Sequence, residues 1–282
     1  MCSNQDVADY YDQTQHHYEN WWQLRDHLSL HYGIWEQETK TFAEALENTN
    51  RILAETAGIS DQTRVLDAGC GVGGAAMFLA KQYKAQVRGI SLSPKQIKLA
   101  NETAFSRNLS DRVQFELKDF TATEYESESF DVVWACESVC HAQDKQAFTD
   151  EAFRLLKPGG KLVLFDFFLT AEDQEDSKAY INKWAATWGV PAFRSVTGFQ
   201  DDLKVSGFRK INQQDYTSKI QKSAKRLYNA AIWGAIPAEF YNLFHPKVQR
   251  WTKTHYQCGY WQYKALKKDL WKYSLFSAEK PA

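Results

Sequence analysis

The chain has 282 residues, of which 44% are hydrophobic and 24% are charged, and its formal net charge is -1 at pH 7. This length suits one large domain, or one domain with a sizeable cap, and the composition is typical of a globular protein. The Lys and Arg residues are spread along the chain. The near-zero net charge gives no indication of a global attraction to nucleic acid or to anionic membranes.

The N-terminus and the cysteines indicate a cytoplasmic protein. Residues 1–19 are polar and lack the apolar core of a signal peptide, and no window approaches the apolar length of a membrane span. The five cysteines form no C-x-x-C pair, and their odd number favours reduced thiols. Cys136 and Cys140 lie four residues apart at a predicted strand end, so we expect no metal site there.

The centre of the chain alternates short apolar strands with helices. Pro94 opens one of these helices, at a position where a missing N–H is harmless, and a Pro-Gly-Gly sequence ends another. We expect strands at 64–69, 85–93, 112–119, 130–138, 161–169, 208–216 and 270–280, and helices at 73–83, 94–108 and 144–160.

This alternation predicts an α/β fold, because apolar strands between helices form a parallel sheet that is covered on both faces. We expect a Rossmann-like, seven-stranded, mostly parallel sheet with helices on both faces, a helical N-terminal lid and a late helical insertion. The expected divisions are a lid over 1–60, a core over 61–216, an aromatic-rich cap over 217–268 and a final core strand within 269–282.

A glycine-rich turn follows the first strand. Gly69, Gly71 and Gly74 form G-x-G-x-x-G, which NAD-binding enzymes also use. Asp67, two residues earlier, is poorly placed beside a pyrophosphate but well placed beside an ammonium group. The second strand ends in "GISLS", without the acidic residue that usually holds the ribose of NAD. These features favour a ligand with adenine, ribose and an amino-acid end but no phosphate, namely S-adenosylmethionine (SAM).

The stretch "VLDAGCGVGG" resembles motif I of class I SAM-dependent methyltransferases, and the resemblance continues in order over residues 62–169. "GISLSPKQ" resembles the subgroup of sterol, tocopherol and cyclopropane-forming enzymes. The resemblance implies that the glycine loop contacts the methionine part of SAM. It also implies that the end of the second strand contacts the ribose and that "KDF" contacts the adenine. The residues so implied are Asp67, Gly69, Cys70, Gly71 and Cys136 for methionine, Ser91, Leu92 and Gln96 for ribose, and Asp119 and Phe120 for adenine.

The segment "LHYGIWE" resembles an "HYG" segment upstream of motif I in cyclopropane synthase-like and tocopherol-like enzymes. The resemblance implies that Tyr32 closes over the methionine end of SAM, with His31, Gly33 and Trp35 as neighbours. The aromatic residues before this segment predict a lid helix that lines the substrate entrance and excludes water. They are Tyr10, Tyr11, Tyr18, Trp21 and Trp22.

The catalytic candidates follow the fourth and fifth strands, whose carboxyl ends meet at the ligand-binding edge of such a sheet. "ESVCHAQDK" resembles the sterol and tocopherol methyltransferase pattern. His141 is the candidate general base because its ordinary pKa lies near neutrality. Asp166 could orient His141 or share its role, and Glu137 could hold an acceptor hydroxyl or amine or stabilise a cation. A purely structural role is the alternative for each.

The acceptor is expected to be a small, largely apolar molecule, whether aromatic, terpenoid or amine-bearing. Residues 228–266 are dense in Trp and Tyr, whose rings can cover such a molecule or form the core of the cap itself. Carbon, nitrogen and oxygen stay open as the methylated atom, and a homodimer is one of the open oligomeric states.

Four alternatives stay open. A nucleic-acid or protein methyltransferase is disfavoured by the neutral charge and by "ACES" in place of an N/D-P-P-Y/F tetrad, so no nucleic-acid partner is expected. A cyclopropane-synthase-like SAM enzyme shares the early motifs and SAM but would need a lipid-binding surface, which the sequence does not reveal. An NAD-dependent oxidoreductase is disfavoured by Asp67 and "GISLS", and a non-catalytic SAM-binding protein by the three catalytic candidates.

Overall fold

The computed structural model describes residues 3–21, 27–245, 247 and 249–282, with the backbone alone for residues 16–21. Its centre is a seven-stranded sheet with the order β3-β2-β1-β4-β5-β7-β6. β7 runs antiparallel to both of its neighbours, and the other neighbouring strands are parallel. The predicted fold class is confirmed. The strands are β1 (Arg64–Ala68), β2 (Gln86–Ser91), β3 (Val113–Leu117), β4 (Phe130–Cys136), β5 (Leu156–Leu169), β6 (Arg209–Asp215) and β7 (Trp271–Glu279).

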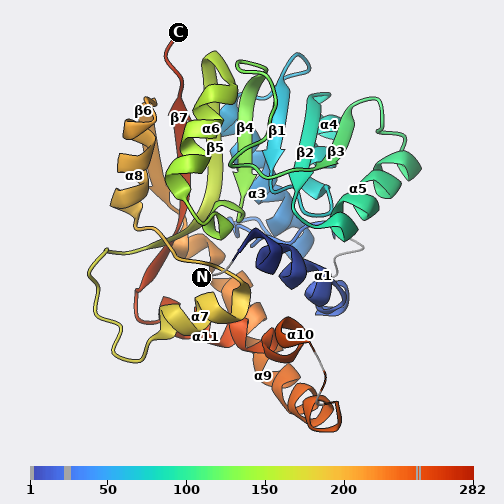
Figure 1. The fold of residues 1–282 in the computed structure, drawn as a ribbon, viewed down its shortest axis with the longest axis vertical. Helices are drawn as coiled ribbons and strands as arrows, with labels where there is room; N and C mark the ends of the chain where they lie inside the picture. The colour runs from blue at the N-terminus through green and yellow to red at the C-terminus, as the bar shows by residue number, and fades with distance from the viewer. Residues whose placement is uncertain (1–2, 22–26, 246, 248) are drawn as a thin grey trace.

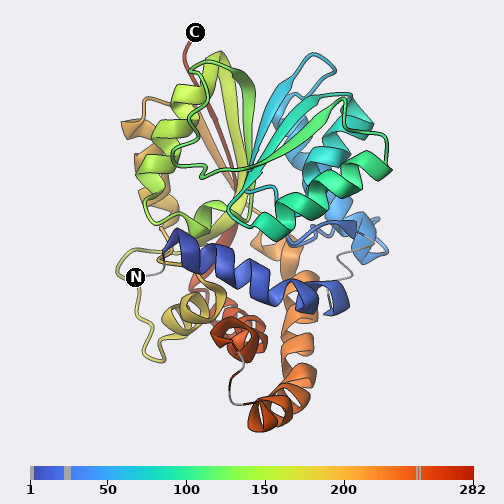
Figure 2. The ribbon, with the colours of Figure 1, turned by 45° about the vertical axis from the view of Figure 1, so that its right-hand side comes forward.

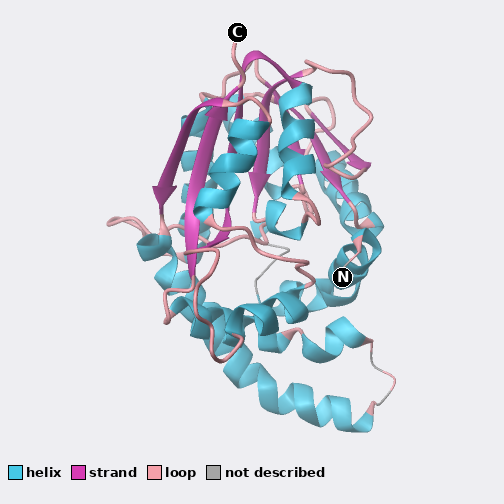
Figure 3. Ribbon diagram, turned by 60° about the vertical axis from the view of Figure 1, so that its left-hand side comes forward, coloured by secondary structure: helices cyan, strands magenta, loops and turns pink. Residues whose placement is uncertain are grey.

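Helices cover both faces of the sheet (Figure 3). Neighbouring residues of one strand point to opposite faces, so Val65 and Leu66 of β1 belong to two different apolar clusters. The first cluster includes α3 (Phe42–Ala57), α4 (Gly74–Tyr83) and α5 (Pro94–Ser106); the second includes α6 (Lys145–Leu155) and α8 (Val196–Val205). The sheet is therefore buried on both sides, which explains its continuous apolar strands.

The remaining helices lie beyond the carboxyl ends of the parallel strands. α1 (Asn4–Trp21) crosses below the sheet, between the sheet and the cap helices (Figure 2). The cap contains α7 (Tyr180–Trp188), α9 (Gln221–Phe244), α10 (Arg250–Thr254) and α11 (Tyr256–Leu266), and two short turns of 3-10 helix complete the fold, η1 (Val139–His141) and η2 (Thr217–Ile220). α9 extends away from the sheet to the lower end of the molecule (Figure 1). No described helix is long and apolar enough to cross a bilayer.

One predicted boundary is wrong. The helix expected over 144–160 ends at Leu155, and β5 begins at Leu156. The Pro-Gly-Gly segment joins the sheet because Gly159 donates its N–H to the Lys280 carbonyl and Lys280 donates to the Gly160 carbonyl. A register shift between β4 and β5 accommodates the extra residues, since Phe130 pairs with Leu156 and Val132 with Lys161.

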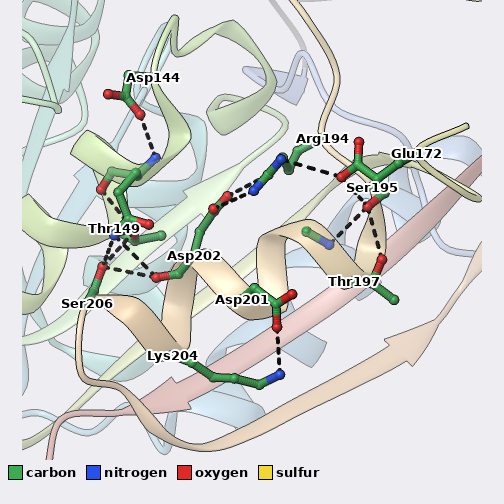
Figure 4. A network of polar contacts seen from close by, with 12 residues as sticks. Asp144, Thr149, Glu172, Arg194, Ser195, Thr197, Asp201, Asp202, Lys204 and Ser206 are labelled. Atoms are coloured by element: carbon green, nitrogen blue, oxygen red, sulfur yellow. Dashed lines mark hydrogen bonds and ion pairs between the residues drawn. The ribbon is translucent and has the colours of Figure 1, made fainter.

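A polar network fixes α8 beside the sheet (Figure 4). Arg194 donates to both carboxylate oxygens of Asp202, at 2.8 and 2.9 Å, in the two-pronged geometry that favours arginine. Ser195 caps the helix by accepting the Gly198 N–H, and Ser206 at the other end hydrogen-bonds to Thr149 of α6. This network holds the segment between α7 and α8, which contains Arg194 and Ser195, against the core.

Candidate active site

A cavity of about 310 Å³ lies at the carboxyl ends of β1, β2 and β4, and residues of α1 form part of its wall. We call it the first cavity. Its lining includes ten of the eleven residues predicted to bind the cofactor: Asp67, Gly69, Cys70, Gly71, Ser91, Leu92, Gln96, Asp119, Phe120 and Cys136. These residues come from separate loops, and the parallel sheet brings them together.

The glycine loop can approach a ligand closely because its glycines carry no side chains and adopt backbone angles that other residues avoid. Gly69 and Gly71 have φ angles of +91° and +53°, in the left-handed region that favours glycine. A Cβ on Gly69 would lie 2.3 Å from the Cβ of Ser138. Ser138 in turn donates its hydroxyl to the Ala68 carbonyl, which ties the ends of β1 and β4 together.

Asp67 lines the first cavity with one carboxylate oxygen that lacks a hydrogen-bond partner in the described part of the chain. Its side chain is 2% exposed, and Oδ2 has no hydrogen-bond partner among the described residues. Burial raises the pKa of Asp67 to about 7. A buried, unpaired carboxylate oxygen is costly unless a cation or a hydrogen-bond donor meets it, so the residue fits the ammonium end of an amino acid.

Polar side chains on the other side of the first cavity are tied to one another and to α1. The Ser91 hydroxyl donates to Oε1 of Gln96 at 2.8 Å. Asp119 accepts from the backbone N–H and hydroxyl of Thr121 through Oδ1, and from the amide of Asn4 through Oδ2. Because Asn4 belongs to α1, the predicted adenine-binding residue also holds the lid helix in place.

Glu137 stands where β4 leaves the sheet, in a strained and buried position. Its φ of +53° is unusual for a residue other than glycine, and such strain is typical of functional sites. Oε1 accepts the backbone N–H of Tyr32 at 2.6 Å and the hydroxyl of Tyr273 at 2.8 Å. Burial is the main cause that raises the pKa of Glu137 to about 8. The carboxyl group is therefore mostly protonated at neutral pH.

His141 lines the first cavity and is held in one tautomer. Its Nδ1 lies 3.1 Å from the Gly189 carbonyl, which can only accept a hydrogen bond, so we place the ring proton on Nδ1. Nε2 then accepts from the Tyr11 hydroxyl, 2.9 Å away on α1. Burial lowers the pKa of His141 to about 4. The ring is neutral at pH 7, and the Tyr11 hydroxyl occupies its Nε2.

Asp166 lies beneath the turn that carries His141 and is not among the residues that line the cavities. Its Oδ2 accepts the N–H of Cys140 at 3.0 Å, and Oδ1 accepts the N–H of Phe167. Lys145 fixes the same turn from the other side by donating to the carbonyls of Cys140, Ala142 and Ala192. Among the described residues, no hydrogen bond joins Asp166 to the ring of His141, so Asp166 acts on that ring through the backbone of the turn.

A second cavity of about 480 Å³ lies between the sheet and the cap. Its walls come mainly from small and apolar residues of α9 and α11. Leu30, Glu137 and Trp188 line both cavities and so form the boundary between them. The polar groups of this second cavity include Gln262, Asn242, Thr252 and His255.

The "HYG" segment joins the cap to the core. The Tyr32 side chain lines the second cavity rather than the first, and its hydroxyl donates to Gln262 of α11 at 2.6 Å. The neighbouring His31 lines the first cavity, and its buried Nε2 has no partner among the described residues. Gly33 is fixed through Ser223 of α9, which both accepts from its N–H and donates to its carbonyl.

The lid residues divide into two groups. Tyr11 reaches the first cavity, whereas Tyr10 is fully buried and packs against Trp251 and His255. The side chains of Tyr18, Trp21 and Trp22 lie outside the described residues.

Sequence reasoning missed the pairing of Tyr11 with His141 and the role of Gln262. Both bonds join residues far apart in the chain, and no local pattern marks them. Within the described parts of the chain, no cluster of three or more His, Cys, Asp or Glu residues is arranged to hold a metal ion.

Comparisons with known proteins define the class. A family model described as a methyltransferase domain matches residues 66–164. The 27-O-demethylrifamycin SV methyltransferase of Amycolatopsis mediterranei is 30% identical over 259 residues, which are 90% of this chain and 90% of that protein. The 2-methyl-6-phytyl-1,4-hydroquinone methyltransferase of Synechocystis sp. is 34% identical over 219 residues, 73% of this chain and 66% of that protein.

Solved structures share the fold over nearly the whole chain. The geranyl diphosphate C-methyltransferase of Streptomyces coelicolor A3(2), in complex with S-adenosyl-L-homocysteine, matches with a TM-score of 0.77 and 16% identity, over 98% of this chain and 97% of that one. The cyclase SpnF matches with a TM-score of 0.81 and 22% identity, over 99% and 97%.

The fold and the first cavity define a SAM-dependent enzyme. The chain belongs to the family of SAM-dependent methyltransferases. SAM is the cofactor of this family, and the unpartnered Oδ2 of Asp67 and the glycine loop fit its amino-acid end. The predicted family, enzyme class and cofactor are confirmed.

Proposed function

We propose that this chain methylates a small, largely apolar acceptor that binds in the second cavity. The observation that carries the proposal is the shared boundary, because Leu30, Glu137 and Trp188 line both cavities. Methyl transfer is an in-line displacement, so donor and acceptor must meet end to end. Two adjoining cavities with a common wall suit that geometry. The relatives named above act on a rifamycin precursor and on a phytylated hydroquinone, which are consistent with an apolar acceptor.

When bound, SAM supplies an electrophilic methyl carbon attached to a positively charged sulfur. Asp67 and the backbone of Gly69, Cys70 and Gly71 would hold its amino-acid end. Ser91, Leu92 and Gln96 would hold the ribose, while Asp119 and Phe120 would hold the adenine. Cys136 lines the same cavity beside Glu137. Tyr32 is assigned to the acceptor side instead, because its ring lines the second cavity.

Tyr11 and His141 line the first cavity, so they would remove the proton of an acceptor whose reactive end reaches across the shared boundary into it. The Tyr11 hydroxyl would take the acceptor's proton as its own proton passes to Nε2 of His141, 2.9 Å away. His141 remains the general base of the proposal, but it acts through Tyr11. Asp166 is then a positioning residue, since it holds the turn through the N–H of Cys140.

Glu137, in its protonated and neutral form, would orient the acceptor through a hydrogen bond. Its two hydrogen bonds from the protein converge on Oε1, so Oε2 is the oxygen that can carry the proton and donate it. A hydroxyl, carbonyl or amine of the acceptor can accept this bond. The role as a stabiliser of a cation would require Glu137 to lose its proton when the ligands bind.

The remaining features belong to the same proposal. The formal charge of -1 supports the absence of a nucleic-acid partner, and the lack of paired cysteines supports a cytoplasmic location. The division into lid, core, cap and final strand is retained, with α7 added to the cap because it packs against α11. A homodimer remains one possible assembly.

The test has two stages. Titration calorimetry with SAM, S-adenosylhomocysteine and NAD compares the wild type with Asp67→Asn, which keeps the shape of the side chain and removes its charge. We expect SAM and its product to bind, NAD not to bind, and the variant to bind SAM at least about tenfold more weakly. NAD binding without SAM binding would overturn the cofactor assignment for this chain.

The second stage supplies SAM together with a panel of hydroquinones, macrolide-like phenols, prenyl compounds and amines. Mass spectrometry then detects methylated product. Methylation that is reduced by Leu227→Trp, which fills the second cavity, supports the proposed acceptor site. SAM binding with no product from any apolar class would favour a non-catalytic or cyclopropane-forming protein.

A further inference from the structure

The near-neutral charge of the chain hides an uneven distribution. Residues 217–268 contain ten of the 34 Lys and Arg residues but only one of the 35 Asp and Glu residues, Glu239. The basic residues are spread along the chain, as the sequence indicates, but the acidic ones are depleted from the cap. The cap is therefore strongly basic, and the rest of the molecule is acidic.

α9 carries its large apolar side chains on the outside. Trp233, Ile236, Phe240, Leu243 and Phe244 are between 63% and 79% exposed. Together with Ile232 they recur at spacings of three and four residues and so share one face of the helix. We call these six residues the apolar stripe. Isolated exposed apolar residues are common, but a contiguous set of this size marks a binding surface.

The opposite face of α9 has the reverse composition. Ala230, Ala231, Gly234 and Ala238 line the second cavity, together with Leu227. A surface helix normally buries its large apolar residues and exposes its small or polar ones. Here the small residues make room for the cavity, and the large residues face outward. The residues of the apolar stripe therefore do not contribute to the hydrophobic core.

Basic residues continue the apolar stripe. Lys222, Lys225 and Arg226 are exposed and lie on the same helical face, one to three turns closer to the N-terminus of α9. Lys222 and Arg226 also lie over the rings of Trp35 and Phe42, so Lys225 is the cation of this group that is directed most freely to solvent. Arg250 and Lys253 are exposed on α10, and the Lys253 carbonyl accepts from the amide of Asn242 near the far end of α9, the end drawn lowest in Figure 1. This end projects away from the sheet in that view. A protruding apolar surface between basic residues matches the surface of an anionic bilayer.

We propose that the apolar stripe of α9 docks onto an anionic lipid bilayer, with the stripe at the level of the headgroups and the basic residues against the lipid phosphates. The contact is peripheral. The same helix then forms both the membrane-facing surface and a wall of the second cavity, which places that cavity next to a reservoir of apolar molecules. The docking itself does not depend on which acceptor the enzyme methylates.

A second copy of the chain fits this surface less well. If two stripes paired in parallel, Lys225 and Arg226 would face their own copies across the interface, and like charges would repel. If they paired antiparallel, the basic end of one helix would be buried against Phe240 and Phe244 of the other, which leaves charges without partners. A bilayer with anionic headgroups satisfies both ends of the stripe.

The test is co-flotation of the full chain with phosphatidylcholine vesicles, with and without phosphatidylglycerol. The apolar variant is Phe240→Ser with Phe244→Ser, and its control is Phe105→Ser on α5, a residue 78% exposed and remote from the cap. The charge variant is Lys225→Glu with Lys253→Glu, and its control is Lys81→Glu with Lys98→Glu on α4 and α5. SAM affinity, measured on every variant, reports correct folding independently of acceptor chemistry.

We expect binding to the anionic vesicles, weaker binding to phosphatidylcholine alone, and release at molar salt, where the screening length falls to about 3 Å. The apolar variant should bind about a hundredfold more weakly and the charge variant about tenfold more weakly, with both controls unchanged. The proposal fails if the folded wild type does not float with anionic vesicles, or if the controls lose as much binding as the variants. It also fails if light scattering shows a dimer that the apolar variant dissociates while vesicle binding is absent.

Discussion

Replacement of Glu137 by Gln should make the protein more stable at alkaline pH. The wild-type carboxyl is buried and binds the N–H of Tyr32 and the hydroxyl of Tyr273 through one oxygen. A Gln side chain has the same shape and an oxygen that accepts both bonds. It has no charge to bury, so the variant lacks the electrostatic penalty that the wild type meets when Glu137 ionises.

The size of the effect follows from the pKa of Glu137, which burial raises from 4.5 to about 8. A group whose pKa is raised by folding contributes stability that is fully present below the unfolded value, near 4.5, and is lost as the pH rises through about 8. At about 1.4 kcal/mol per pKa unit, this shift sets an upper bound of about 5 kcal/mol on the loss. We expect the variant and the wild type to differ by less than about 1 kcal/mol at pH 4 to 5 and by several kcal/mol at pH 9.

Urea denaturation at several pH values measures the free energy of unfolding of both proteins. Glu151→Gln is the matched control, because hydrogen bonds from Arg154 and Thr123 outweigh burial and lower the pKa of Glu151. That variant should lose stability at neutral and alkaline pH and lose little in acid. The reasoning about Glu137 is refuted if the wild type and Glu137→Gln have parallel pH profiles.

Three further predictions concern the site and the packing around it. SAM binding at pH 7 should release protons, because the positive charge of the ligand lowers the pKa of Asp67 from about 7. Calorimetry in two buffers of different ionisation enthalpy measures the number of protons released, and proton uptake would contradict the prediction. Tyr11→Phe should lower kcat about a hundredfold and leave SAM affinity unchanged, because the variant cannot relay a proton to His141. Stopped-flow kinetics measures kcat and calorimetry measures SAM affinity. An unchanged kcat would exclude the relay. Gly74→Ala would place a Cβ 1.9 Å from the backbone oxygen of Leu28 and should lower the free energy of unfolding by about 1 to 3 kcal/mol. Gly234→Ala, whose Cβ would meet nothing within 4 Å, should raise it by about 0.5 to 1 kcal/mol. Urea denaturation measures both values, and equal effects would refute the packing argument.

Predictions from the sequence succeeded where the signal is local. Within residues 64–69 the apolar Val65 and Leu66 are followed by Asp67 and a glycine turn, a pattern that marks a buried strand leading into a ligand site. Position 69 requires glycine because its φ is positive and because a Cβ there would collide with Ser138, and the motif alone already indicates this requirement. The order of the core elements followed in the same way, from the alternation of strand and helix periods.

The end of α6 was misjudged for a physical reason. Pro-Gly-Gly stops a helix wherever it occurs, but the helix ended earlier, at Leu155, because Gly159 and Gly160 find hydrogen-bond partners at Lys280. Those partners lie 120 residues away in the chain, beyond the reach of any local pattern.

The sequence by itself determined the fold class, the family and the loop that meets the cofactor, because each depends on residues that are neighbours in the chain. Only the tertiary structure decided which candidates share a cavity. It paired His141 with Tyr11 across 130 residues, moved Tyr32 to the second cavity through Gln262, and set Asp166 beneath the turn rather than beside the ligand. These contacts arise from the docking of α1 and the cap onto the sheet, and that docking depends on packing over the whole chain rather than on any single motif.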